Sequence, residues 1–114
     1  MFSDKRAKNH LENIDGVKAI KLVRNLRAVV YTWKTELGFG ADDLPKLGFY
    51  AQEVGEAGIG EAVTVVASPE TADRGIPDYH AIDKSQLLAV LWAAVSQLSE
   101  KIEDLEKGKV QSPG

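Results

Sequence analysis

The sequence predicts a mixed α and β fold in a single small domain. Two segments, residues 13–26 and 85–107, repeat apolar residues at helical spacing. Between them, short runs rich in valine and aromatic residues alternate with loops that contain glycine and proline, which is typical of strands. A chain of 114 residues, 44% of them hydrophobic, can bury a real but small core and has no room for a second domain.

The composition argues against several classes of function. The net charge is −3 and no basic run follows the N-terminal cluster, so we expect no nucleic-acid partner. The chain has no cysteine and its two histidines are isolated, so we expect no metal site and no cofactor. The Asp42-Asp43 pair lacks the ligand spacing of a calcium loop. No stretch approaches the roughly 20 apolar residues of a membrane span and the start lacks the apolar core of a signal peptide, so we expect a soluble product with no membrane partner.

A serine and several basic residues lie close together at the start of the chain. Ser3 and Lys8 suggest serine-lysine chemistry, in which a neutral amine removes the hydroxyl proton during attack on a carbonyl. Their offset of five residues fits neither a strand nor a helix, so a turn must bring them together. The lysine must also lose its proton, which Lys5 and Arg6 favour and Asp4 opposes unless it faces elsewhere. A solvated terminus is the competing explanation.

The first helix begins after Asp15, its expected N-cap. Its apolar face is formed by Val17, Ile20, Val23 and Leu26, and its basic face by Lys18, Lys21 and Arg24. We interpret the basic face as solvated, because no glycine-rich loop accompanies it to form an anion site.

Short strands and loops fill the middle of the chain. Residues 27–34 alternate as a strand, with Tyr31 and Trp33 expected in the core. The segments that follow are a loop, a strand running into a helical turn, a strand, a polar loop and a short extended segment, at residues 36–47, 47–54, 61–67, 68–77 and 78–83. Gln52 and Glu53 could each be hydrogen-bonded in the interior or simply solvated.

The last apolar run predicts one helix over residues 85–107, with Asp83 or Ser85 as its cap. Its apolar residues recur at alternating steps of three and four for nearly three heptads, which is the pattern of a coiled-coil seam. The seam consists of Leu88, Leu91, Val95, Leu98, Ile102 and Leu105. In this frame Lys101 falls at position g and Glu106 at the next e, so a parallel neighbour in register could pair the two charges.

The first half of the same helix is apolar almost all round. From Leu87 to Val95 it carries Trp92 at position e and Ala94 at position g, in addition to the seam. We therefore expect this half to be buried against the rest of the domain as well, so that one helix serves two interfaces.

Four segments, taken in order, carry a resemblance to a known family. They are Ser3-Asp4-x-Arg6-x-Lys8 followed by Asn13-Ile14; Val30-Tyr31-x-Trp33-Lys34; Gly48-Phe49-x-Ala51-Gln52-Glu53-Val54; and Ala81-Ile82-Asp83 before Leu87-Leu88. Their order and spacing resemble the C-terminal intramolecular chaperone domain of bacteriophage tail spikes and tail fibres, the peptidase S74 domain. The resemblance spans nearly the whole chain.

This resemblance implies a homotrimer that holds three copies of an upstream fibre or spike stem together while it folds, and then cuts itself off. The cut would fall between Phe2 and Ser3, with Ser3 as nucleophile and Lys8 as base. The implied fold is α+β, with a small irregular β-sheet near the N-terminal helix and a long C-terminal helix that projects into a trimeric coiled coil. The chain would then comprise a globular part, a coiled-coil helix and a flexible tail, at residues 1–84, 85–108 and 109–114.

The resemblance also implies a place and an oligomeric state. The domain would act in the host cytoplasm during virion assembly and leave the tail fibre after cleavage. Valine and isoleucine at a with leucine at d is a pattern that favours two strands. We nevertheless expect three, because Leu87, Trp92 and Ala94 widen the apolar face.

The alternative is a trimerisation or receptor-binding tip of a fibre protein that never cleaves. An enzyme acting on outside substrates is a third hypothesis, which no further constellation of residues supports. A gel of the full-length precursor distinguishes the first two, because only the self-cleaving domain releases a fragment of this size.

Overall fold

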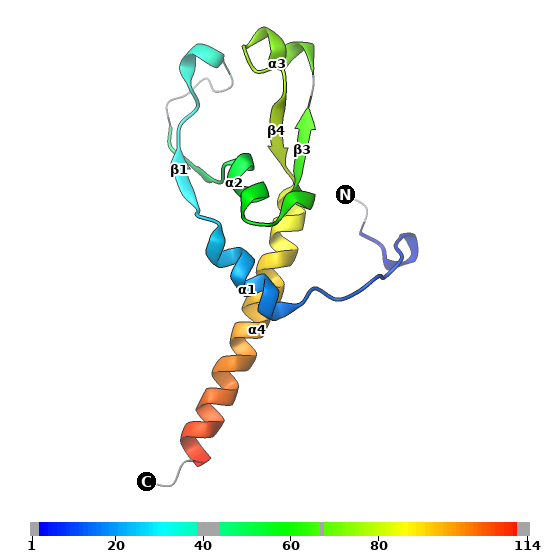
Figure 1. Ribbon diagram of the computed structural model, residues 1–114, viewed down its shortest axis with the longest axis vertical. Coiled ribbons are helices and arrows are strands. Elements are labelled where there is room, and N and C mark those ends of the chain that lie inside the picture. The colour runs from blue at the N-terminus through cyan, green and yellow to red at the C-terminus, as the bar shows by residue number, and fades with distance from the viewer. Residues whose placement is uncertain (1–2, 39–43, 67, 112–114) are drawn as a thin grey trace.

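The computed structural model describes residues 3–38, 44–66 and 68–111, and in them the α+β class is confirmed (Figure 1). The Asp42-Asp43 pair lies outside the described residues. The α-helices are α1 (Gly16–Asn25), α2 (Ala51–Glu56), α3 (Pro69–Asp73) and α4 (Lys84–Gln111). The strands are β1 (Val29–Tyr31), β2 (Lys46–Gly48), β3 (Val63–Val66) and β4 (Tyr79–Ile82). Three short 3-10 helices are η1 (Lys5–Ala7), η2 (Thr35–Leu37) and η3 (Gly60–Ala62).

Helix α1 begins where the sequence predicts and packs against α4 (Figure 1). The carboxylate of Asp15 accepts hydrogen bonds from the backbone N–H groups of Val17 and Lys18, at 2.9 and 3.3 Å, which confirms it as the N-cap. The buried centre of the helix is Ala19, while Val17 on the predicted apolar face is 45% exposed. Only part of the apolar face of α1 is therefore buried against α4.

Two separate two-stranded sheets replace the single small sheet that we predicted. β1 pairs antiparallel with β2, with Val29 opposite Gly48, and β3 pairs antiparallel with β4, with Val63 opposite Ile82. In Figure 1 the two hairpins stand on either side of α2, so the helix fills the position that a continuous sheet would need.

The prediction that Tyr31 and Trp33 are core aromatics is wrong. Both side chains are half-buried, and their rings meet edge to face with centroids 5.4 Å apart. A side chain at Gly48 would lie 3.0 Å from the Tyr31 ring, so the ring covers the opposite strand. These aromatics stabilise the first hairpin instead of the central core.

The core lies where α1, α2, the β3–β4 hairpin and the start of α4 meet. Val54, Ile59 and Ala62 form its buried centre. The partly buried residues around them are Leu22, Leu26, Val63, Ile82, Leu87 and Val90. Except for Val54 and Ile59, the buried hydrophobic residues in the described ranges are alanines, so the core is small.

A Schellman motif ends α2 and folds the chain back into this core. The Ile59 N–H donates to the Val54 carbonyl at 3.1 Å and the Gly58 N–H donates to the Gly55 carbonyl at 3.1 Å. Gly58 has φ of +101°, and a Cβ there would lie 2.9 Å from Cδ2 of Leu22. Glycine is therefore needed at residue 58 for both its backbone conformation and the close approach of α1.

The segment predicted as a polar loop over residues 68–77 contains α3. Ser68 caps this helix, because its hydroxyl accepts from the Thr71 N–H at 3.2 Å, and Pro69 occupies the first turn. The loop prediction missed this capped single turn.

Helix α4 follows directly on β4, packs against α1 along its first half and projects beyond the other elements along its second half (Figure 1). Asp83 is its cap: its carboxylate accepts from the Ser85 N–H at 3.0 Å and from Gln86 Nε2 at 3.1 Å. The helix reaches Gln111, beyond the predicted end at Lys107. The radius of gyration is 19.3 Å, against about 13 Å for a compact domain of this length, so the chain is strongly elongated.

Candidate functional site

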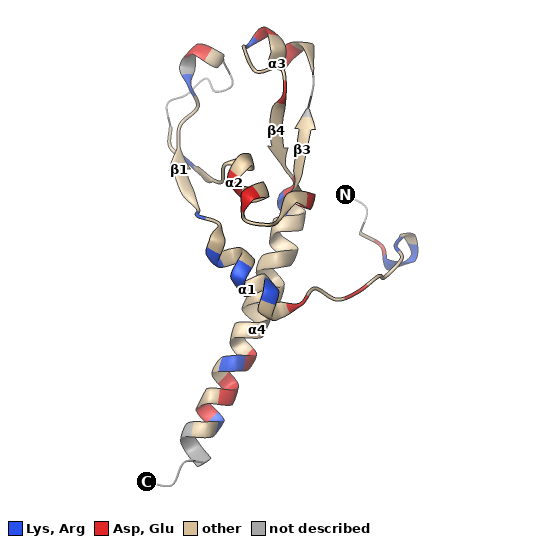
Figure 2. Ribbon diagram, viewed as in Figure 1, with Lys and Arg blue, Asp and Glu red and all other residues tan. Residues whose placement is uncertain are grey.

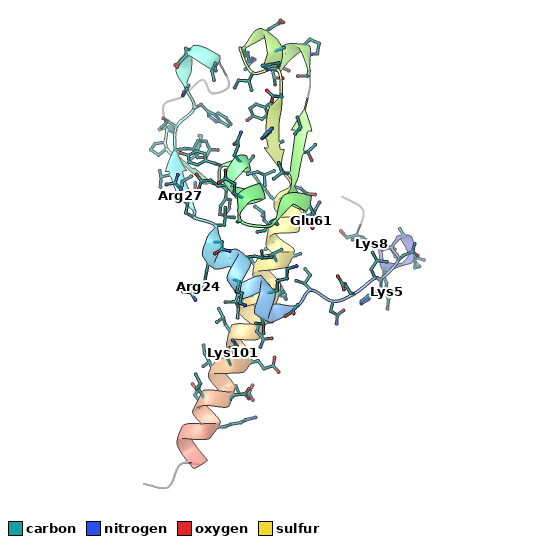
Figure 3. All side chains as sticks on the ribbon, in the orientation of Figure 1. Lys5, Lys8, Arg24, Arg27, Glu61 and Lys101 are labelled. Carbon is teal, nitrogen blue, oxygen red and sulfur yellow. The ribbon has the colours of Figure 1, made fainter. Side chains whose placement is uncertain are left out.

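The predicted nucleophile and base lie on an exposed N-terminal arm, residues 3–14. Every described residue of this arm is exposed, including Leu11 at 92%. The arm leads away from α1 and α4, and Lys5 and Lys8 lie near its far end (Figures 1 and 3). The arm therefore takes no part in the core of its own chain.

A 3-10 turn separates the two predicted site residues. In η1 the Ala7 N–H donates to the Asp4 carbonyl at 3.0 Å and the Lys8 N–H donates to the Lys5 carbonyl at 3.1 Å. Ser3 and Lys8 thus flank the kind of turn that their offset of five residues requires. Both residues are exposed, and in the described part of the chain no hydrogen bond joins their side chains.

Asp4 is held by Arg6 at this turn. Its carboxylate accepts from the Arg6 backbone N–H at 2.8 Å and from Arg6 Nη2 at 2.8 Å. The Arg6 side-chain hydrogen bonds, followed by the backbone one, lower the pKa of Asp4. The carboxylate that could have stabilised a charged Lys8 is therefore engaged by a different cation.

The six seam residues of α4 are all exposed, from 44% at Leu98 to 72% at Leu105. A different face of the same helix is covered: Ala94 is 2% exposed, and Leu87 and Val90 pack on the core. The predicted burial of the first half of α4 against the domain is confirmed for Leu87, Val90 and Ala94, but it is wrong for Trp92, which is 72% exposed. The seam itself is not covered by the described residues of its own chain.

Charge divides α4 into two halves, as Figure 2 shows. Residues 85–99 contain no charged side chain, whereas four acidic and two basic residues lie in the range from Glu100 to Lys107. Lys107 pairs with Glu103 at 3.2 Å along the helix. The outer half is thus solvated around a continuing apolar stripe, which is the composition of a coiled coil.

One protein family matches the segment that contains the arm, α1, the first hairpin and α2. The model of the peptidase S74 family, described as chaperone of endosialidase, matches residues 3–64, just over half of the chain. The chain belongs to the peptidase S74 family. This confirms the resemblance to a chaperone domain associated with phage tails over the first three of its four segments. The fourth, Ala81-Ile82-Asp83 before Leu87-Leu88, lies outside the matched residues. Membership implies an intramolecular chaperone with autoprocessing, in a family that generally acts on trimeric fibre proteins.

Within this S74 domain, sequence reasoning missed the ion pair between Arg27 and Glu53. Arg27 Nε and Nη2 donate to the two Glu53 carboxylate oxygens at 2.7 and 2.8 Å, and the guanidinium lies 5.6 Å from the centre of the Tyr50 ring. The Arg27 hydrogen bonds lower the pKa of Glu53. No local signal could have revealed this pair, because its partners lie 26 residues apart.

A groove of about 560 Å³ lies between α1 and the first turns of α4. Its lining residues are Glu12, Asn13, Ile14, Asp15, Lys18, Ala19, Leu22, Gly58, Ile59, Glu61, Gln86, Ala89 and Val90. Ser3 and Lys8 do not line it, so it is separate from the predicted cleavage site.

In the described residues 3–38, 44–66 and 68–111, no group of three or more histidine or acidic side chains could hold a metal ion. The helices of the described chain include none that is long and apolar enough to cross a membrane.

Proposed function

We propose that this S74 domain trimerises through α4, holds three copies of an upstream fibre or spike stem together while they fold, and then releases itself by cutting before Ser3. The observation that carries the proposal is the continuous, uncovered apolar seam of α4 in a family that generally acts on trimeric fibre proteins. The domain would act in the host cytoplasm while the virion assembles.

The energy available to the seam supports assembly. Burying each of its six side chains contributes about 1.5 to 3 kcal/mol, hence on the order of 10 kcal/mol per chain before conformational entropy is subtracted. The core is small and rich in alanine, so this is a large sum relative to the stability of one chain.

A parallel arrangement follows from the charges beside the seam. Position g of one helix faces position e of the next heptad of a parallel neighbour, which pairs Lys101 with Glu106. In an antiparallel pair, position g would instead face position g and position e would face position e, so Lys101 would not pair with Glu106. The parallel arrangement also places the three stems at the same end, as joint folding requires.

Three strands are preferred to two because of the family, not because of the helix face. Leu87 and Ala94, which we expected to widen the seam, are turned to the core and to α1 within their own chain. Trp92 remains exposed. The trimeric fibres on which the family generally acts are therefore what supports a trimer.

Tethering three chains has a clear advantage for the stem. Intertwined β-structure depends on non-local contacts between chains, which form slowly and are prone to aggregate. A common tether raises the effective concentration of the stems to roughly the millimolar range. Cleavage afterwards makes assembly irreversible.

The proposed cut needs no group beyond Ser3, Lys8 and water. The Ser3 hydroxyl attacks the carbonyl carbon of residue 2 while neutral Lys8 takes its proton. The new ester bond replaces the peptide bond, the proton passes to the departing amine of Ser3, and water then hydrolyses the ester. Because Lys8 is exposed in the single chain, we propose that trimer contacts desolvate the arm and that cleavage follows assembly.

The test uses a precursor with its stem attached, followed on a gel. Ser3→Ala should fold but remain uncut. Lys8→Arg keeps the charge but cannot lose its proton, so it should also remain uncut, whereas the matched Lys5→Arg should still release the fragment. An intact band from the unaltered precursor would instead favour the non-cleaving trimerisation or receptor-binding tip.

A further inference from the structure

Trp92 is a large aromatic side chain that its own chain does not cover. It is 72% exposed and occupies position e, beside the apolar seam of α4. Tryptophan is the residue type most enriched among side chains that dominate protein interfaces. Its position at the edge of a coiled-coil seam makes a second copy of the chain the natural partner.

The register of the proposed coil fixes which part of that copy Trp92 meets. In a parallel coil, position g lies beside position e five residues later on the neighbouring helix. The rule that pairs Lys101 with Glu106 also pairs Leu87 with Trp92. The charge pair in the outer half and the apolar pair in the inner half therefore require the same register.

Helix α1 lies on this g side of α4. Ala94, at the next g position, is 2% exposed, and a Cβ on Gly16 would lie 2.7 Å from Cβ of Gln97. Leu22 packs on the core together with Leu87, so α1 crosses α4 with its direction largely reversed (Figure 1). A neighbour that approaches the g side must therefore also meet α1.

The two flanks of α1 differ in character. The groove between α1 and α4 lies on the flank of Lys18, away from the seam, and includes Ala89 on α4. By helical geometry the opposite flank, which carries Ile20 and Val23, is the one nearer the seam. Both of these side chains are only half-buried.

We propose that in the trimer the indole of Trp92 packs against Ile20 and Val23 of the neighbouring chain, beside that chain's Leu87. This inference rests on the proposed trimer and adds a specific contact to it. The contact ties α1, and so the arm that precedes it, to the adjacent subunit.

The contact can be measured by fluorescence, because the chain has two tryptophans and Trp33→Phe leaves Trp92 as the sole reporter. In the assembled Trp33→Phe protein, we expect blue-shifted emission and several-fold weaker acrylamide quenching than in a Leu98→Asp, Ile102→Asp monomer. Adding Ile20→Ala and Val23→Ala should raise quenching while the protein stays trimeric in sedimentation. The matched control, Lys18→Ala on the other flank, should leave quenching unchanged, and circular dichroism checks that each variant folds.

Each outcome bears on a defined claim. A trimer in which Trp92 stays open to acrylamide overturns the contact and leaves the proposed function standing. A shielded Trp92 that is insensitive to Ile20→Ala and Val23→Ala overturns its assignment to α1. A protein that is monomeric at all concentrations overturns both the contact and the proposed assembly.

Discussion

Two short hydrogen bonds at the surface join Arg27, which lies between α1 and β1, to Glu53 of α2. The guanidinium is oriented further by the Tyr50 ring, so the pair has defined geometry although it is solvent-accessible. Such pairs contribute modestly and depend on protonation.

This pair predicts a pH-dependent effect of Glu53→Gln. Arg27 lowers the pKa of Glu53 from its usual 4.5, so the folded chain binds this proton less readily than the unfolded chain. The contribution of the pair is present above about pH 4.5 and is lost as the pH falls through the lower, folded pKa. Denaturant unfolding at a series of pH values should show that the variant has a lower free energy of unfolding than the unaltered chain at pH 7. This difference should disappear in acid.

Glu56→Gln provides the control for this measurement, because Glu56 is an exposed residue of the same helix. It should change the free energy of unfolding little at any pH. A gap for Glu53→Gln that is the same at pH 7 and well below pH 4.5 would show that the ion pair is not its origin.

Residue-scale prediction from the sequence succeeded where the determining contact is local. Asp15 was predictable as a cap, and Asp83 as one of two candidates beside Ser85, because each aspartate bonds a backbone N–H two residues ahead. Whether Glu53 is hydrogen-bonded or solvated could not be predicted, because its partner Arg27 is distant in sequence. Tyr31 was misplaced because alternation shows that two aromatics share a face and not what covers it.

At the scale of elements, α4 is the part that sequence reasoning described best. Its heptad repeat is long and regular, and its division between a covered face and an open seam follows from the apolar pattern. The short elements were less predictable: α3 is a single capped turn, and pairing of four short strands into two hairpins depends on where α2 packs.

The turn between α2 and η3 gives a prediction about Gly58. Gly58→Ala and Gly75→Ala both place a side chain at positive φ, +101° and +90°, but only the first brings Cβ against Leu22. Positive φ should cost about 1 to 2 kcal/mol in each variant. The overlap with Leu22 should cost Gly58→Ala about 1 to 3 kcal/mol in addition. Gly58→Ala should therefore be less stable than Gly75→Ala.

Thermal and denaturant unfolding of these variants provide the measurement, with Gly60→Ala as a control at a site with open space and no positive φ. Equal losses for Gly58→Ala and Gly75→Ala would show that α1 does not pack against this turn.

The whole molecule is built around surfaces that one chain leaves open. Its longest dimension is 67 Å and its shortest is 23 Å. The six seam residues of α4 are exposed, and so is the N-terminal arm that precedes α1. The predicted seam and the predicted site residues are thus both outside the core. Ser3 and Lys8, the proposed cleavage residues, are both exposed, so the described part of a single chain does not remove water from Lys8.

The central claim is that assembly through α4 precedes cleavage at Ser3. A precursor that carries Leu98→Asp and Ile102→Asp places charge on two seam positions, and the matched control Ala89→Asp and Ser96→Asp adds the same charge at exposed positions off the seam. Sedimentation establishes the oligomeric state of each. A seam variant that remains trimeric would show that the globular part holds the oligomer.

The most direct measurement is the appearance of the released fragment with time in these two precursors. We expect the seam variant to be monomeric and to yield no fragment, while the control is cut to completion as a trimer. Cleavage at the normal rate by a seam variant proven to be monomeric would contradict the coupling of release to assembly.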